Sequence, residues 1–258
     1  MSTALVTGAT AGIGAAFARQ LAARGDDLVL VARDADRLAT IATELQATHG
    51  VAVETLQADL SDADDLHRVA ERVASAEKRV DLLVNNAGFG PTASLLDDLG
   101  EHDRAWAVMG EAVVVLSNAA ARAMVTRGHG RVLNVASLSA WVTQGEYSAI
   151  KSFVKLYTEA LAGELRGTGV TATALCPGWV TTEFHERASI QTSAIPTAVW
   201  VDADRCVREA LAHADAGRVV SLPTKRWKAM AIALQLAPRP LVRALSGAIG
   251  RDRRRRTP

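Results

Sequence analysis

The stretch of residues 4–25 limits most strongly what this chain can fold into. Apolar residues 4–6 read as a short strand that runs into a turn containing Gly8, Gly12 and Gly14, and a helical pattern follows. Glycine lets the backbone turn sharply and lets a phosphate approach the N–H groups at a helix N-terminus. Strand, glycine-rich turn and helix together predict a phosphate-binding unit at the start of the chain. A plain glycine-rich connection is the alternative.

Strand-like and helix-like segments alternate along the rest of the chain. Apolar strands are predicted at residues 28–32, 51–56, 80–84, 131–136, 170–175 and 218–222. Helical patterns cover residues 35–49, 61–78 (with Ser61 as N-cap), 101–127, 145–166 and 202–216. Short connections between alternating elements predict a single α/β domain with a parallel sheet and helices on both faces.

Composition excludes several classes of protein. The chain has 258 residues, 49% of them apolar, and a formal net charge of +1, which fits one sizeable core and argues against nucleic acid as the main partner. Cys176 and Cys206 form no disulfide framework, and the histidines show no metal-ligand spacing. No signal peptide or membrane-spanning segment is recognisable. We therefore expect a cytoplasmic protein without a metal.

The residue after the second predicted strand bears on the choice of dinucleotide. An acidic residue at this strand end binds a ribose 2′-hydroxyl, whereas an arginine suits a 2′-phosphate. The chain has Arg33 here and Arg37 one turn later, while Asp34 and Asp36 fit as residues of a helix N-terminus. We predict NADP(H) rather than NAD(H); a solvated arginine at a helix start is the alternative.

Residues 145–166 carry Tyr147 and Lys151 four positions apart. On a helix this spacing puts both side chains on one face. A positive charge near a phenol lowers its pKa, so Tyr147 becomes a candidate to exchange a proton with an alcohol or carbonyl oxygen. Ser137, at the end of an apolar run upstream, offers a hydroxyl. Taken alone, a tyrosine and a lysine at this spacing are more often a surface pair.

Six short motifs occur in order: Thr7-Gly8-x3-Gly12-x-Gly14, Asp59-Leu60, Asn85-Asn86-Ala87-Gly88, Ser137, Tyr147-x3-Lys151 and Pro177-Gly178-x-Val180-x-Thr182. On these residues the chain resembles the short-chain dehydrogenase/reductase family. The resemblance implies a Rossmann-type, doubly wound parallel sheet of seven strands with a nicotinamide cofactor across the carboxyl ends of the strands. It also implies that Ser137 holds the substrate oxygen, that Tyr147 exchanges its proton, and that Lys151 binds the nicotinamide ribose and lowers the tyrosine pKa.

The same resemblance implies a set of cofactor-binding residues and a homodimer or homotetramer. The set is Gly8, Thr10, Gly12, Ile13, Gly14, Arg33, Asp59, Leu60, Asn85, Ala87, Gly88, Tyr147, Lys151, Pro177, Gly178, Val180 and Thr182. Asp59 and Leu60 are expected near the adenine, and Thr182 at the carboxamide.

The chain departs from the family at two points. Members usually place an asparagine, which helps to hold a proton-relay water, at the position where this chain has Met109, and a methionine side chain cannot hold that water. The interval from Ser137 to Tyr147 is also about three residues shorter than usual, so the loop between them should be tighter. Ser139 is a rival to Ser137 as the substrate-binding serine.

Three further expectations concern the substrate side and the end of the chain. Five aromatic residues should approach the cleft, with core packing as the alternative: Phe89, Trp141, Trp179, Phe184 and Trp200. Residues 183–201 should form a lid over the catalytic domain of residues 1–222. Residues 223–258 should form a helical extension whose arginine-rich tail either meets an anionic membrane surface or partner, or is a solvated end.

The most consistent function is an NADP(H)-dependent oxidoreductase that interconverts a secondary alcohol and a ketone on a hydrophobic small molecule. The alternative is a cofactor-binding protein with little catalysis, which the replacement at Met109 keeps open.

Overall fold

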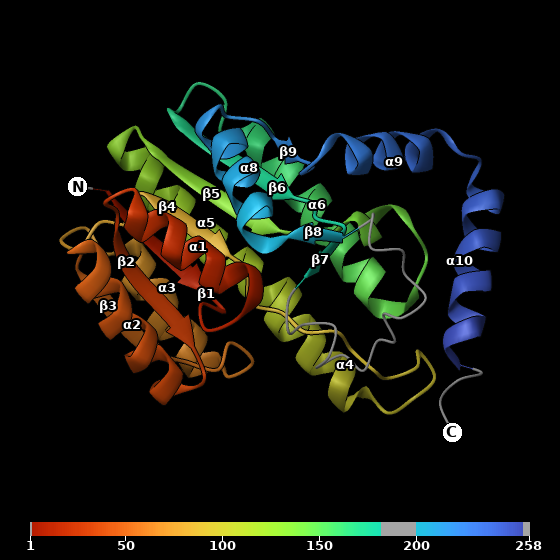
Figure 1. The fold of residues 1–258 in the computed structure, drawn as a ribbon, viewed down its shortest axis with the longest axis horizontal. Helices are drawn as coiled ribbons and strands as arrows, with labels where there is room; N and C mark the ends of the chain where they lie inside the picture. The colour runs from red at the N-terminus through yellow and green to blue at the C-terminus, as the bar shows by residue number, and fades with distance from the viewer. Residues whose placement is uncertain (1, 182–199, 255–258) are drawn as a thin grey trace.

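A computed structural model of the chain describes residues 2–181 and 200–254 (Figure 1). Its centre is a seven-stranded sheet with the strand order β3-β2-β1-β4-β5-β6-β9, in which every neighbouring pair is parallel. The strands are β1 (Thr3–Thr7), β2 (Asp27–Ala32), β3 (Val53–Gln57), β4 (Leu82–Asn85), β5 (Gly130–Val135), β6 (Val170–Leu175) and β9 (Val220–Ser221). This order, which reverses direction between β1 and β4, confirms the Rossmann-type prediction.

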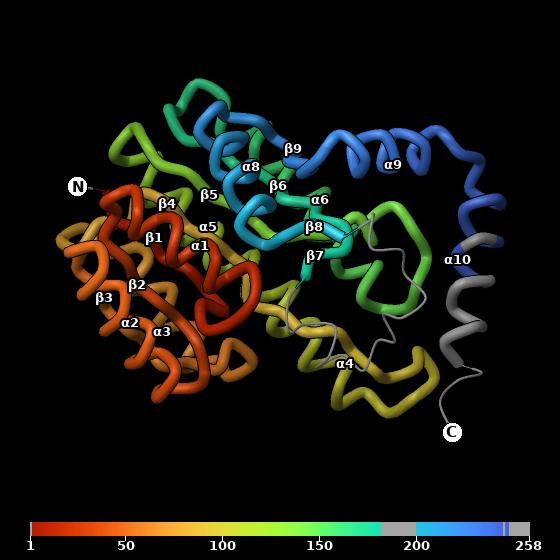
Figure 2. The backbone as a smooth tube through the Cα atoms, in the orientation of Figure 1, coloured from red at the N-terminus to blue at the C-terminus, as the bar shows by residue number. Residues whose placement is uncertain are grey.

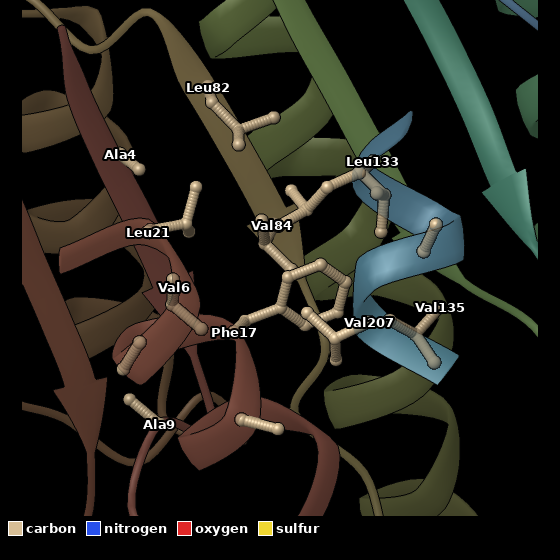
Figure 3. Close-up of a cluster of buried hydrophobic side chains, with 14 of the residues drawn as sticks. Ala4, Val6, Ala9, Phe17, Leu21, Leu82, Val84, Leu133, Val135 and Val207 are labelled. Atoms are coloured by element: carbon tan, nitrogen blue, oxygen red, sulfur yellow. The ribbon is translucent and has the colours of Figure 1, made fainter. Parts of the chain in front are cut away.

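Helices cover both faces of the sheet. They are α1 (Gly12–Ala23), α2 (Ala35–His49), α3 (Ala63–Ala74), α4 (Leu99–Trp106), α5 (Ala112–Arg127), α6 (Gly145–Glu164) and α8 (Ala203–Asp215). Buried residues of α1, α2 and α8 form one core cluster with the sheet, and those of α3 and α5 form another on the opposite face. Alternation along β1 shows why: Ala4 and Val6 belong to the first cluster and Leu5 to the second. Figure 3 shows Phe17 and Val207 packed with Val84 in the first cluster.

Helix ends follow local side-chain chemistry. Asp34 caps α2 by accepting a hydrogen bond from the backbone N–H of Arg37. The N-cap of α3 is Asp62 rather than the predicted Ser61, and its carboxylate accepts from the next turn's backbone N–H groups. The side chain of Ser61 instead donates to Asp59 at 2.7 Å, so the aspartate one position later takes over the cap.

The long helical segment of residues 99–127 contains a widened turn that the sequence did not predict. Residues Ala107–Glu111 form a π-helical segment, called η1, between α4 and α5, in which the N–H of Ala112 donates to the carbonyl of Ala107 five residues back. Such insertions are frequent at functional sites. Among the described residues, the whole segment Leu99–Arg127 is the one helix long and apolar enough to cross a membrane. Half of its most apolar window is buried against the fold, as in a core helix.

Beyond β6 the chain forms a small second sheet and a helical extension. Strands β7 (Trp179–Thr181) and β8 (Trp200–Asp202) pair in parallel, and residues 182–199 between them, which include most of the predicted lid, lie outside the described residues. The extension consists of α9 (Lys225–Leu236) and α10 (Arg239–Arg254), and α9 runs away from the edge strand β9 (Figure 2). Helix α10 begins at Arg239, and Pro240 fits in its first turn.

Candidate active site

The sequence motifs gather at the carboxyl edge of the central strands. Residues 8–14 follow β1, residues 86–88 follow β4, Ser137 follows β5 and residues 177–178 follow β6. Because β1, β4, β5 and β6 are parallel neighbours, these segments meet at one edge of the sheet. This edge is where open α/β sheets bind their ligands.

The glycine-rich turn after β1 forms a close-fitting backbone cradle. Gly8 and Gly12 have φ angles of +64° and +53°, which favour glycine. A Cβ atom on Gly14 would lie 2.1 Å from the carbonyl oxygen of Gly8. Helix α1 begins here without a side-chain cap, so its first N–H groups remain available to an anion. The cradle therefore fits the pyrophosphate of a dinucleotide.

Two residues that we did not predict as ligands fix this cradle to the loop after β4. The hydroxyl oxygen of Thr7 accepts hydrogen bonds from the backbone N–H groups of Asn86 (2.9 Å) and Ala87 (3.0 Å). The side-chain amide of Asn86 donates back to the carbonyl of Thr7 at 2.9 Å. Both residues belong to the sequence motifs, but their spacing gave no sign that they bind each other.

The side chain of Asn85, at the carboxyl end of β4, is buried inside the fold. Its buried amide donates to Asn134 at 2.9 Å and to Ser117 at 3.1 Å, inside a polar network between the sheet and α5. The side chain of Asn134 continues this network to Thr158 on α6. The side chain of Asn85 thus joins elements in the interior, and the cofactor-binding role of this residue stays a prediction.

The three residues predicted to be catalytic lie together. Ser137 is hydrogen-bonded to the Tyr147 phenol. The Lys151 ammonium lies 5.6 Å from the centre of the Tyr147 ring and donates to the carbonyl of Val135 at 2.8 Å. The rival Ser139 is in contact with Ser137, at 3.0 Å between the hydroxyl oxygens, rather than with the phenol.

The electrostatics of this group differ from the prediction. Burial raises the pKa of Tyr147 to about 12, and the hydrogen bond from Ser137 opposes this shift only in part. Burial also lowers the pKa of Lys151 to about 8. The sequence predicted a lowered tyrosine pKa, but the cost of removing a phenolate from water is larger than the opposing interactions. At neutral pH the pair is therefore a neutral phenol beside an ammonium, which is a proton donor.

Arg33 lies at the far end of the same edge, beside Asp59. The two side chains are 3.8 Å apart, Arg33 is mostly exposed, and Arg104 from α4 approaches the same Asp59 oxygen at 3.4 Å. Arg33 and Asp59 border a cavity of about 270 Å³ whose lining also includes Arg68, which we did not predict. Arg37 donates to the carbonyl of Thr10, in the turn after β1, at 2.9 Å. Leu60 is buried in the core beneath this end.

Comparison with known proteins decides the family. A model of the family described as short chain dehydrogenase matches residues 2–192. This chain belongs to the short-chain dehydrogenase family.

Individual relatives agree. A short chain dehydrogenase from Pseudocercospora fijiensis is 35% identical over 70% of this chain, and the match spans 60% of that relative's length. A short-chain dehydrogenase from Sphingobium yanoikuyae, solved in complex with NADPH, is 34% identical with a TM-score of 0.83, covering 91% of this chain and 94% of that one. A bulky-bulky ketone specific alcohol dehydrogenase from Comamonas testosteroni is 30% identical with a TM-score of 0.78, covering 91% and 92%. Our chain is thus an oxidoreductase of this family.

The C-terminal extension of this short-chain dehydrogenase reaches the active-site loops from beyond the family match. A Cβ atom on Gly178 would lie 2.3 Å from the indole of Trp227, so this α9 side chain covers the Pro-Gly motif closely. The hydroxyl of Ser246 on α10 accepts from the N–H of Thr143, in the shortened loop before Tyr147. These contacts were not predictable, because the extension shows only an apolar helical pattern. Thr182 lies outside the described residues.

Met109 occupies the widened turn η1 next to the cofactor edge. It is fully buried, and a Cβ atom on Gly88 would lie 3.2 Å from its sulfur. Its neighbours in the same apolar cluster include Ala105, Ile150 and Val154. The position that lacks the usual asparagine is therefore filled by a well-packed apolar side chain.

Among the described residues, no cluster of His, Cys, Asp or Glu gathers that could hold a metal ion.

Replacing Met109 with asparagine tests whether this dehydrogenase needs the asparagine amide. We expect turnover to change by about tenfold or less, because main-chain groups of η1 can already hold the relay water and one added hydrogen-bonding group changes the activation free energy little. Steady-state kinetics would measure this. Met124→Asn is the matched control, since Met124 is equally buried on α5 against Gly130; it should lower thermal stability alone. A very slow wild type that Met109→Asn accelerates far beyond tenfold would contradict the prediction.

Proposed function

We propose that this enzyme is an NADP(H)-dependent oxidoreductase that interconverts a secondary alcohol and a ketone on a hydrophobic small molecule. The observation that carries the proposal is the hydrogen-bonded group of Ser137 and Tyr147, with Lys151 on the same helix face, beside the glycine cradle. A hydroxyl, a phenol and an ammonium at one strand edge suit proton exchange with a substrate oxygen.

The cradle and its surroundings fit a nicotinamide dinucleotide. Gly8, Gly12 and Gly14 would hold the pyrophosphate, Arg33 the 2′-phosphate, and Lys151 the nicotinamide ribose. When bound, the nicotinamide supplies or takes up the hydride at the substrate carbon. The remaining predicted ligands, Thr182 among them, stay proposals of the same kind.

The protein's own contribution is to handle one proton. Ser137 donates a hydrogen bond to the substrate oxygen and orients it toward the phenol. In the reductive direction the neutral phenol of Tyr147, whose pKa burial raises to about 12, gives its proton to that oxygen. The Lys151 ammonium nearby stabilises the phenolate that forms, and this interaction is strong because both groups are buried.

The apolar surroundings of Tyr147 support a hydrophobic substrate. Phe89 and Trp141 pack against the same apolar cluster as Tyr147. Trp179 contacts Trp200 across the small second sheet, with ring centres 5.6 Å apart, and Trp179 packs against the first core cluster. Phe184 lies outside the described residues. The bulky-ketone enzyme among the relatives agrees with this substrate class.

A panel of ketones tests the proposal directly. NADPH oxidation should be fastest with ketones that carry large apolar groups and slow with small polar ones. NADPH binding without turnover on any ketone would favour the alternative, a cofactor-binding protein, which the fully buried Met109 keeps open.

Charge reversal at Arg33 tests the cofactor. Arg33→Asp should weaken NADPH binding by about ten- to a hundredfold, because a phosphate loses a charge-assisted hydrogen bond. Preference should shift toward NADH, since a carboxylate there can bind the ribose 2′-hydroxyl. Fluorescence titration with both cofactors measures this. Arg122→Asp on the exposed side of α5 is the control for net charge. A wild type that binds NADH more tightly than NADPH would refute the assignment of Arg33.

The oligomeric state, the cellular location and the role of the arginine-rich tail stay proposals. We expect a cytoplasmic homodimer or homotetramer, as is usual in the family. The arginine-rich end extends past residue 254, beyond the described residues, so its attachment to a membrane surface or partner stays a hypothesis.

A further inference from the structure

The segment of residues 89–98 connects β4 to α4 without strand or helix, and it is tied to α4 at two points. The Glu101 carboxylate accepts hydrogen bonds from the backbone N–H groups of Thr92 (2.7 Å) and Ala93 (3.0 Å). One residue later, Nε2 of His102 lies 3.0 Å from the carbonyl oxygen of Ser94. Since the segment starts with Phe89, which packs in the apolar cluster of Tyr147, it forms part of the substrate side.

His102 also contacts the catalytic helix. Its Nδ1 lies 2.7 Å from the carboxylate of Glu146 in the first turn of α6, directly before Tyr147. Both side chains are largely buried, with 11% and 16% of their surface exposed. One imidazole therefore joins the segment of residues 89–98 to the residue that precedes the proposed proton donor.

The partners of His102 determine the protonation that it needs. A carbonyl oxygen and an ionised carboxylate can only accept hydrogen bonds, so both ring nitrogens must carry a proton. A neutral ring has one N–H and loses one of the two contacts. The neighbouring charges favour the doubly protonated ring, because Glu146 on α6 and Asp97 on the segment are both acidic. The carboxylate of Glu101 on α4 binds the backbone of residues 92–93 instead.

We propose that His102 is a positioning residue whose doubly protonated ring holds the substrate-side segment of residues 89–98 against the N-terminal turn of α6 at Tyr147. The effect on substrate binding rests on the proposed function, whereas the clamp itself does not. The hydrogen bond to Glu146 is the main reason that the pKa of His102 is raised above its ordinary value, and the Ser94 carbonyl adds to it. Because the folded-state pKa is raised, both contacts are complete below the ordinary histidine pKa and one is lost as pH rises through the raised value.

Histidine NMR of the full chain without cofactor tests the clamp. His102 should titrate above the ordinary value of about 6.5, and Glu146→Gln should lower its pKa. In His102→Gln both N–H donors sit on a single nitrogen, which cannot reach both partners, so amide hydrogen exchange should accelerate in residues 89–98 and at the start of α6. His67→Gln is the matched control, because His67 forms a similar pair with Glu71, at 3.2 Å, on the exposed surface of α3; it should leave exchange at residues 89–98 unchanged.

Kinetics give a second readout. In His102→Gln we expect KM for a ketone at pH 6 to rise roughly three- to tenfold, the scale of one ordinary hydrogen bond, while kcat and the Kd for NADPH change little. In the wild type KM should rise with pH through the His102 pKa, and this rise should be absent in the variant. A His102 that titrates at or below the ordinary value, or unchanged exchange and KM in His102→Gln, would overturn the proposal. If no ketone is reduced at all, the proposed function fails, and the NMR and exchange results still decide on the clamp.

Discussion

Replacing Tyr147 with phenylalanine should lower kcat by at least about a hundredfold, the usual scale for losing a general acid. The substitution keeps the ring that packs against the apolar cluster and removes only the hydroxyl that is hydrogen-bonded to Ser137. With the phenol gone, the Ser137 hydroxyl that would hold the substrate oxygen is a far weaker acid than tyrosine. The Kd for NADPH should stay within about threefold, because one lost hydrogen bond is worth little to a large cofactor.

The chain supplies its own control for this experiment. Its second tyrosine, Tyr157, lies on the same helix, and its hydroxyl donates to the carbonyl of Val114 at 3.4 Å. Tyr157→Phe removes an equivalent hydroxyl from α6 without touching Ser137 or Lys151, so kcat should remain close to that of the wild type. Stopped-flow measurement of NADPH oxidation under single turnover would separate the chemical step from product release. Unaltered turnover in Tyr147→Phe would remove this residue from the mechanism.

The fold was predictable because its sheet is buried on both faces. Residues 28–32 are apolar without interruption, and the structure shows alternate residues of β2 packing into the two core clusters. A strand of this kind requires helices on both sides. The glycine turn after β1 then indicates that a cofactor would bind at the carboxyl ends of the central strands. The grouping of Ser137, Tyr147 and Lys151 followed from the resemblance to the family.

Features that depend on contacts between distant parts of the chain were not predictable. The widened turn η1 has no sequence signature, since it differs from an α-helix only in which carbonyl Ala112 binds. The contact of Trp227 with Gly178 joins residues far apart in the sequence. The pKa of Tyr147 was predicted in the wrong direction because spacing shows the nearby lysine but not the depth of burial. The role of Asn85 in an interior network was hidden for the same reason.

Adding a single methyl group at Gly14 should weaken NADPH binding by at least about tenfold. The new Cβ of Gly14→Ala would lie 2.1 Å from the carbonyl oxygen of Gly8 and 2.5 Å from the side-chain nitrogen of Asn86. Neither atom can move aside easily. Gly8 is held by its N–H bond to the carbonyl of Val31 at 2.8 Å, and Asn86 is held by Thr7. The start of α1 must therefore shift, and the N–H groups that we propose to bind the pyrophosphate shift with it.

Gly163→Ala is the matched control for this prediction. Gly163 lies within α6, and no atom of a neighbouring element is within 4 Å of the position that its Cβ would occupy. Alanine there should raise the free energy of unfolding by up to about 1 kcal/mol, because it reduces the freedom of the unfolded chain and favours helix. Gly14→Ala should lower the free energy of unfolding by about 1–3 kcal/mol through overpacking. Thermal unfolding and NADPH fluorescence titration of both variants measure the two effects. A Gly14→Ala variant with wild-type affinity and stability would show that the cradle can adapt, and the pyrophosphate would then have to bind elsewhere along this edge.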